Sequence, residues 1–150
     1  MLNPITATAQ TVILKSEADT MALGQDLAFQ LKAADVVYLI GDLGAGKSTL
    51  ARALIRRLTH EAQDVPSPSF SLMEIYEAAE FNILHVDLYR LKSPEEIYEI
   101  GLFELAAEAV SLIEWPQHLE HLGFDEFIEI RLETTPDYRL AHIRKHNGRY

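Results

Sequence analysis

A short glycine-rich segment that ends in lysine and serine is the part of the sequence with the clearest chemistry. It reads Gly-Asp-Leu-Gly-Ala-Gly-Lys-Ser over residues 41–48, which fits the G-x-x-x-x-G-K-[ST] pattern of a loop that holds nucleotide phosphates. Glycine permits backbone angles that a Cβ atom would forbid, so successive amide N–H groups can converge on phosphate oxygens. At average residue frequencies, a chance match in a chain of this size should occur well under ~1 time in 100. The candidate nucleotide-binding residues here are Gly41, Asp42, Leu43, Gly44, Ala45, Gly46, Lys47, Ser48 and Thr49.

Three side chains at the end of this segment have separate expected roles. Lys47 would bring a positive charge to the β- and γ-phosphates, and the Ser48 hydroxyl is the expected Mg²⁺ ligand. Thr49 follows and is placed to touch the α-phosphate. Asp42 is a carboxylate inside an anion-binding loop, so we expect it to point away from the phosphates. The competing interpretation is a glycine-rich turn before an ordinary helix.

Two acidic residues end apolar runs and are candidates for a second Mg²⁺ ligand. Residues 83–86 lead to Asp87, and residues 110–113 lead to Glu114. A phosphate loop needs such an acid at the end of a neighbouring strand, and α/β proteins bind ligands at the carboxyl ends of their strands. One acid would hold the metal while the other orients or deprotonates water, and spacing alone does not rank them. Either could instead be a surface acid, and His85 is expected to be a core histidine with satisfied hydrogen bonds.

A stiff loop with hydroxyl groups follows the predicted phosphate-loop helix. Ser67 and Ser69 flank Pro68 there, and their hydroxyls offer ligands for a metal or a γ-phosphate. The segment is therefore a candidate nucleotide-sensing switch, and an ordinary connection is an equally good interpretation. Trp115, next to Glu114, would lie near a bound base or fill the core, and the core is the favoured place.

The nucleotide expected from these signals is ATP. The sequence holds no Asn-Lys-x-Asp stretch, which would read guanine, and no Asp-x-x-Gly after a strand. His118 and His121 lie near Glu114, but their spacing is no established metal-ligand spacing, and the chain has no cysteine at all. Disulfides, thiolate metal sites and cysteine nucleophiles are thereby excluded.

Strands and helices must alternate to place these residues together. Continuous apolar runs such as residues 36–40 suit strands buried on both faces of a parallel sheet, whereas alternation over residues 127–133 suits a half-exposed strand. The predicted fold class is α/β: a P-loop NTPase with a central, mostly parallel sheet flanked by helices, and antiparallel strands added at the edges. Expected strands are 11–15, 36–40, 70–76, 82–87, 110–114, 127–133 and 138–144; expected helices are 16–32, 47–58 and 94–108, the last capped by Ser93 and broken near Gly101.

Length and charge limit the remaining possibilities. At 150 residues, and with no repeat or linker, we expect a single domain over residues 1–150. The chain carries 13 basic and 23 acidic residues, a net charge of −10, which disfavours unaided binding of nucleic acid. No apolar run is long enough to span a membrane and no signal peptide is evident, so a cytoplasmic protein is expected. The basic residues near the end are read as an exposed strand: Arg139, Arg144, Lys145 and Arg149.

Four segments together resemble one known family. They are residues 41–48, Ser-Pro-Ser-Phe at 67–70, His-Val-Asp-Leu-Tyr-Arg-Leu at 85–91 and Leu-Ile-Glu-Trp-Pro at 112–116. Their order and spacing over roughly residues 10 to 135 resemble the bacterial TsaE (YjeE) family, the ATPase subunit for threonylcarbamoyladenosine synthesis on tRNA. The phosphate loop alone is generic, and the last two segments make the resemblance specific.

The resemblance implies a role for each candidate residue. Lys47 would hold phosphates, Ser48 would bind Mg²⁺, Glu114 would be the Walker B-type acid, and Asp87 a second essential acid near the γ-phosphate. It also implies that Ser69 belongs to a switch-like loop and is a metal ligand. Trp115 would lie near the site. Ser48 and Ser69 stand where the family commonly has threonine, and both keep the hydroxyl.

The resemblance also implies the cofactors, partners and reaction. ATP and Mg²⁺ would be the cofactors, and the partners would be transferase subunits of the TsaB and TsaD type, with tRNA contacted only through them. ATP hydrolysis would support threonylcarbamoyl transfer to adenosine next to the anticodon. Two other classes share the phosphate loop: a small-molecule kinase, which needs an acceptor site and a lid, and a module that binds ATP without turnover.

Overall fold

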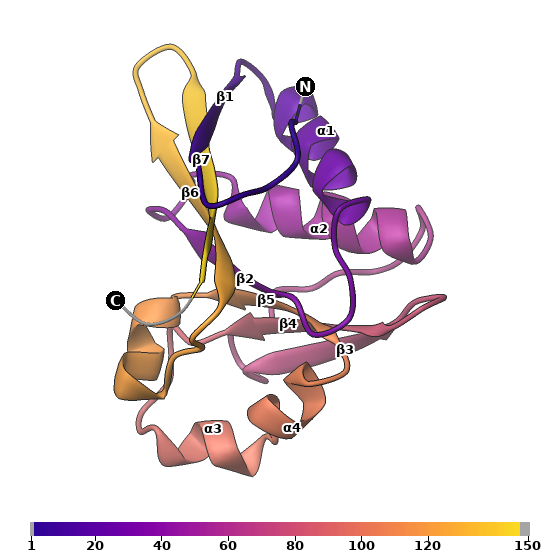
Figure 1. Ribbon diagram of the computed structural model, residues 1–150, viewed down its shortest axis with the longest axis vertical. Coiled ribbons are helices and arrows are strands. Elements are labelled where there is room, and N and C mark those ends of the chain that lie inside the picture. Colours follow the sequence, from indigo (N-terminus) through magenta and orange to yellow (C-terminus); the bar gives the residue numbers. More distant parts are fainter. Residues whose placement is uncertain (1, 148–150) are drawn as a thin grey trace.

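One mixed sheet runs through the part of the chain that the computed structural model describes, residues 2–147. Its seven strands lie in the order β1-β7-β6-β2-β5-β4-β3 (Figure 1). The strands are β1 (Gln10–Leu14), β2 (Val36–Ile40), β3 (Met73–Glu77), β4 (Asn82–Asp87), β5 (Val110–Glu114), β6 (Phe127–Thr134) and β7 (Arg139–His146).

The centre of the sheet is parallel and its edges are antiparallel. β2 pairs in parallel with both β5 and β6, and β4 pairs in parallel with β5. β3 joins one edge antiparallel to β4, while β7 and β1 extend the other edge beyond β6. The expected α/β architecture is therefore confirmed, including the antiparallel strands at the edges.

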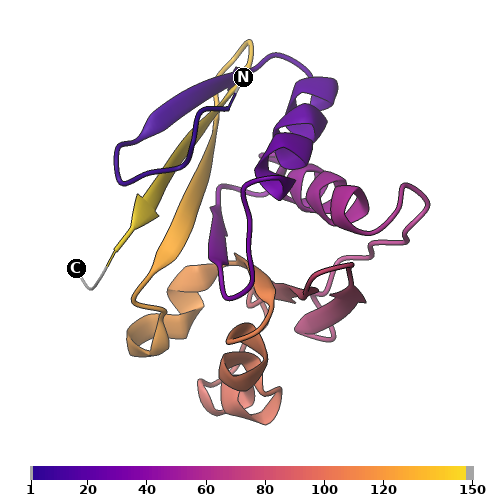
Figure 2. The same cartoon turned by 45° about the vertical axis from the view of Figure 1, so that its right-hand side comes forward.

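Helices cover both faces of this sheet. α1 (Glu17–Ala28) and α2 (Lys47–Leu58) lie on one face, and α3 (Glu95–Glu99), α4 (Leu102–Ala106) and the 3₁₀ helix η1 (Pro116–Leu122) lie on the other. Figures 1 and 2 show the first pair packed side by side and the short helices beneath the opposite side of the sheet.

Strand β2 shows why an unbroken apolar run suits the centre of the sheet. Successive side chains of a strand point to opposite faces. Val37 and Leu39 therefore join the core under α1 and α2, whereas Val36 and Tyr38 join the core on the α3 and α4 side. The same alternation in β4 and β5 sends His85, Asp87 and Glu114 toward the α2 face, since His85 pairs with Leu112 and Asp87 with Glu114.

Several of the expected element boundaries are wrong, and three of them bear on the fold. α1 ends at Ala28, several residues before the expected end. β3 begins only at Met73, because residues 69–71 form a turn and Leu72 has a positive φ of 68°. Pro94, not Ser93, occupies the N-cap position of α3, and no side chain caps that helix.

The break at Gly101 is confirmed, because its φ of 72° separates α3 from α4. Among the described residues no helix could cross a membrane, since α1 and α2 have 12 residues each and a span needs about 20.

Candidate functional site

The glycine-rich segment forms the turn between β2 and α2, at the carboxyl end of β2. Gly46 has a φ of 106°, a left-handed conformation that side chains rarely adopt. A Cβ atom on Gly41 would lie 2.8 Å from the backbone oxygen of Leu132 on the neighbouring strand. The two glycines of the pattern are thus required by backbone angle at one position and by close packing at the other.

Lys47 is turned inward over this loop and is only 6% exposed. Its Nζ donates a hydrogen bond of 2.6 Å to the backbone oxygen of Gly41 and lies 4.2 Å from the centre of the Trp115 ring. No carboxylate among the described residues forms an ion pair with it. The lysine charge is therefore held at the loop without a neutralising acid.

The two candidate acids lie side by side. Asp87 ends β4 and Glu114 ends β5, and the two residues are direct partners in the parallel pairing. Adjacent strands are about 4.8 Å apart, and paired residues point to the same face of the sheet. Both carboxylates are nearly buried, with 6% and 5% of each residue exposed. The expectation that both reach the carboxyl edge of the sheet is confirmed.

Asp87 is held by the hydroxyl-bearing loop. The Ser69 hydroxyl donates to one carboxylate oxygen at 3.0 Å, and the Tyr89 backbone N–H donates to the other at 2.9 Å. Ser69 in turn shares a 2.8 Å hydrogen bond with Ser67. The Ser67–Ser69 segment is thus tied directly to a strand-end acid.

Glu114 has a different partner, which sequence reasoning placed only in the core. His85 is buried, and its Nε2 lies 2.9 Å from Oε2 of Glu114. Its other ring nitrogen, Nδ1, has no partner among the described residues, so the expectation of a fully satisfied histidine is wrong. A signal was available: His85 precedes Asp87 by two residues and therefore shares its face of the strand.

One pocket of about 350 Å³ is lined by Lys47, the Ser67 and Ser69 hydroxyl loop, Asp87 and Glu114, while His85 lies outside its lining. It collects most of the candidate residues, whereas Gly41, Asp42 and Ala45 do not line it; Ala45 is buried in the core. Asp42 is exposed to solvent. The predicted site residues that line the pocket are Leu43, Gly44, Gly46, Lys47, Ser48, Thr49, Ser69, Asp87, Glu114 and Trp115.

Arg139 also lines the pocket, which the sequence did not predict. It is the first residue of β7, and its Nη2 donates a 3.0 Å hydrogen bond to the backbone oxygen of Gly44. The interpretation of the basic end as an exposed strand is therefore wrong at this position, and Arg149 lies outside the described residues. Arg90, three residues after Asp87, does not line the pocket, and its guanidinium carbon lies 4.3 Å from the centre of the Phe70 ring.

The donor set suits magnesium better than a metal that needs an all-protein cage. Among residues 2–147 no three His, Cys, Asp or Glu side chains gather as a metal site. Mg²⁺ is commonly held by one or two carboxylates together with substrate phosphates and water. Two carboxylates and the Ser48 and Ser69 hydroxyls around one pocket fit that requirement.

Fold and site together define a class: an α/β protein with a mixed sheet and a glycine-rich loop that joins a central strand to a helix beside two strand-end acids. Comparison with known families narrows this class. The family described as "Threonylcarbamoyl adenosine biosynthesis protein TsaE" matches residues 14–142. The chain belongs to the TsaE family.

Individual relatives agree with this assignment. The chain is 45% identical over 133 residues to the tRNA threonylcarbamoyladenosine biosynthesis protein TsaE of Rickettsia felis, covering 88% of this chain and 78% of that one. It is 38% identical over 130 residues to TsaE of Aquifex aeolicus, covering 86% and 93%. Among solved structures, Bacillus subtilus YdiB matches with a TM-score of 0.76 at 24% identity, covering 94% of this chain and 87% of that one. That likeness supports the fold.

Proposed function

We propose that the chain is a P-loop ATPase that binds ATP with Mg²⁺ and hydrolyses it in support of threonylcarbamoyl transfer to tRNA by partner subunits. One observation carries the proposal: a single pocket brings Lys47, Ser48 and Ser69 together with Asp87 and Glu114. These are the cation, hydroxyls and acids that phosphoryl transfer needs around a triphosphate.

The binding step uses the loop and the start of α2. Backbone N–H groups of residues 41–48 and the helix amino terminus provide an anion site. Lys47 contributes charge to the β- and γ-phosphates, and Thr49 lies where it can reach the α-phosphate. Arg139, held on the opposite side of the loop from the acids, adds a second cation toward the nucleoside end.

The two acids differ in their free oxygens, which supports separate roles. Both oxygens of Asp87 accept hydrogen bonds, whereas Oε1 of Glu114 accepts none from the described residues. Glu114, with the Ser48 and Ser69 hydroxyls, would hold Mg²⁺, which when bound neutralises charge on the phosphates. Asp87 is left to act on the attacking water.

Hydrolysis then requires few groups from the chain. The water oxygen bonds to the γ-phosphorus as the bond from that phosphorus to the β–γ bridging oxygen breaks, and Asp87 orients the water and accepts its proton. Among the described residues, Arg139 is the one arginine that lines the pocket, and it lies away from Asp87 and Glu114. Arg90 packs on the Phe70 ring instead. Because an arginine supplied by a partner accelerates such reactions strongly, we expect slow turnover by the chain alone.

The family assignment supports the partners. Its relatives are tRNA threonylcarbamoyladenosine biosynthesis proteins, and transferase subunits of the TsaB and TsaD type would carry out the transfer in the cytoplasm. A net charge of −10 disfavours direct contact with a phosphate backbone, so tRNA would be held by those subunits.

Phosphate release with and without purified transferase subunits tests the proposal. We expect faster release with them, weaker ATP binding for Lys47→Ala, and normal binding without hydrolysis for Asp87→Ala. Equal rates with and without partners would contradict activation, and normal hydrolysis by Asp87→Ala would contradict the role of that acid. Phosphate transferred to an added metabolite would instead identify a small-molecule kinase.

A further inference from the structure

A second cavity, of about 530 Å³, is lined by residues of α1, of α2 and of the segment that follows α2. Figures 1 and 2 show these two helices packed together on one side of the sheet. α2 contributes one face of it, with three arginines at positions 52, 56 and 57. Arg52 and Arg56 are one turn apart and therefore lie on the same face of the helix, and Arg57 lines the cavity next to them. We call this cavity the α1–α2 groove; its lining includes Met21, Thr49, Arg52, Ala53, Arg56 and Arg57.

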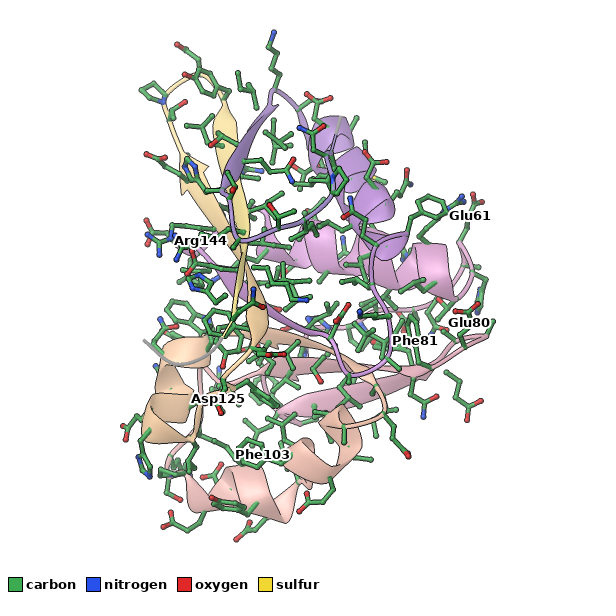
Figure 3. All side chains as sticks on the ribbon, viewed as in Figure 1. Glu61, Glu80, Phe81, Phe103, Asp125 and Arg144 are labelled. Carbon is green, nitrogen blue, oxygen red and sulfur yellow. The ribbon has the colours of Figure 1, made fainter. Side chains whose placement is uncertain are left out.

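The groove carries more positive than negative charge, although the chain as a whole is acidic: three arginines and two glutamates line it. The sequence has 23 acidic residues against 13 basic ones, yet within residues 2–147 none of the three arginines forms an ion pair with a carboxylate. Arg56 donates through Nε to the backbone oxygen of Gln63, and Arg57 lies 4.7 Å over the Phe29 ring. The two glutamates that also line the groove are Glu17, the first residue of α1, and Glu61, which follows α2 (Figure 3).

Apolar side chains stand beside these charges. Phe29, under Arg57, is 70% exposed, and Met21 in the groove is 41% exposed. Arginine, methionine and aromatic residues are enriched at protein–protein interfaces, and the tightest contacts often centre on arginine and aromatic side chains. A phosphate backbone would gain nothing from the apolar part and would be repelled by the remaining charge. The combination favours an acidic protein segment that also presents apolar side chains.

We propose that the α1–α2 groove is a docking site for an acidic, partly apolar segment of a partner protein. The groove is connected to the phosphate pocket, because Thr49 lines both cavities. A segment docked there contacts the same helix that begins with Lys47 and Ser48. The partner and the nucleotide would therefore act on one rigid element from two sides.

Charge reversal at two of the arginines tests the proposal. The variant is Arg52→Glu with Arg57→Glu, which spares Arg56 and its bond to the backbone. The matched control is Lys32→Glu with Lys92→Glu, since both lysines are exposed and the change in net charge is the same. The probes are a synthetic peptide of alternating glutamate and leucine, purified tRNA, and the purified transferase subunits, each titrated at two salt concentrations.

We expect the peptide to bind the wild-type chain and the lysine control alike, and the arginine variant at least about tenfold more weakly, the loss that marks a residue important for binding. Equal peptide binding by all three chains, or no binding by the wild type, would overturn the proposal. Binding of tRNA that depends on Arg52 and Arg57 would overturn it in favour of a nucleic-acid surface. Unchanged thermal unfolding and ATP binding of both variants show that the fold is kept.

The titration with transferase subunits rests on the proposed function, and its result is interpreted separately from the peptide result. If those subunits bind the wild type and bind the arginine variant at least about tenfold more weakly, they carry the acidic segment. If they do not bind the wild type at all, the proposed function fails while the peptide result still decides the groove.

Discussion

The imidazole Nε2 of His85 lies 2.9 Å from Oε2 of Glu114, and both side chains are almost fully buried. With its proton on Nε2, the ring donates to the carboxylate and fixes its orientation at the pocket. A histidine or carboxylate that orients a metal ligand changes metal affinity although it never touches the metal. The geometry thus makes His85 a positioning residue for Glu114.

Replacement of His85 should weaken Mg²⁺ binding specifically. His85→Leu removes the donor, and we expect the Mg²⁺ affinity of the nucleotide-bound chain to fall about 10- to 100-fold. His85→Gln keeps an N–H donor and should recover part of that loss. Titration of Mg²⁺ against a fluorescent ATP analogue measures this, with binding in EDTA as the control that should not change. A Leu variant with wild-type Mg²⁺ affinity would show that the pair is only structural.

The position of Lys47 over Trp115 should make that ring a sensor of bound nucleotide. The chain has one tryptophan, and the Lys47 Nζ lies 4.2 Å from its centre. If phosphates draw the ammonium away, a cation–π contact of about 0.5–2 kcal/mol is lost and the emission changes. Lys47→Met should have a baseline emission like that of the nucleotide-bound wild type. Emission that stays constant at saturating ATP would contradict movement of the lysine.

The local parts of the site could be predicted from the sequence because their signals are local. β2, α2, β4 and β5 have the expected bounds, since an apolar run and helical spacing are read within about ten residues. The places of Asp87 and Glu114 at the carboxyl edge of the sheet follow from the same runs, whereas their direct pairing is known only from the structure.

The missed features depend on contacts between distant segments. Arg139 lies 95 positions from its partner Gly44, and only the antiparallel placement of β7 beside β6 brings it to the loop. Similarly, β3 starts late because Ser69 is held by Asp87, 18 positions away. Neither pairing leaves a periodic pattern that a sequence reading could detect.

The contact of Arg139 with the loop predicts a loss of nucleotide affinity on truncation. In the proposed function this arginine also donates to the bound nucleotide, and a hydrogen bond that involves a charged group is worth about 1.5–3 kcal/mol, so Arg139→Ala should bind ATP roughly 10- to 100-fold more weakly. The affinity for AMP should fall by a similar factor, because Arg139 lies away from the acids and would contact the nucleoside end that AMP shares with ATP. Arg131→Ala is the matched control, because Arg131 is exposed on the adjacent strand. Equal affinities for both variants, measured by calorimetry, would contradict a role for Arg139.

The buried hydroxyl of Tyr76 allows a test of the stability of the fold that does not involve the phosphate pocket. The residue is 7% exposed in the core beneath α2, and its hydroxyl has no partner among the described residues. An unpaired buried hydroxyl costs about 1–3 kcal/mol. Tyr76→Phe should therefore raise the free energy of unfolding at pH 7 by about 1 kcal/mol, measured in urea. Tyr98→Phe is the control, because Tyr98 is 56% exposed and its replacement should change little.

The same hydroxyl predicts how stability changes in alkali. Burial raises the pKa of Tyr76 above its ordinary value of 10.0, and the charges of Glu74 and Asp64 raise it further. A group whose pKa is raised by folding binds its proton more tightly in the native state, so its contribution to stability is complete below pH 10.0 and is lost as the pH rises through the folded pKa. The Phe variant has no proton to lose, so its advantage over the wild type should grow above that pH. A constant difference between the two chains from pH 7 into alkali would contradict the raised pKa.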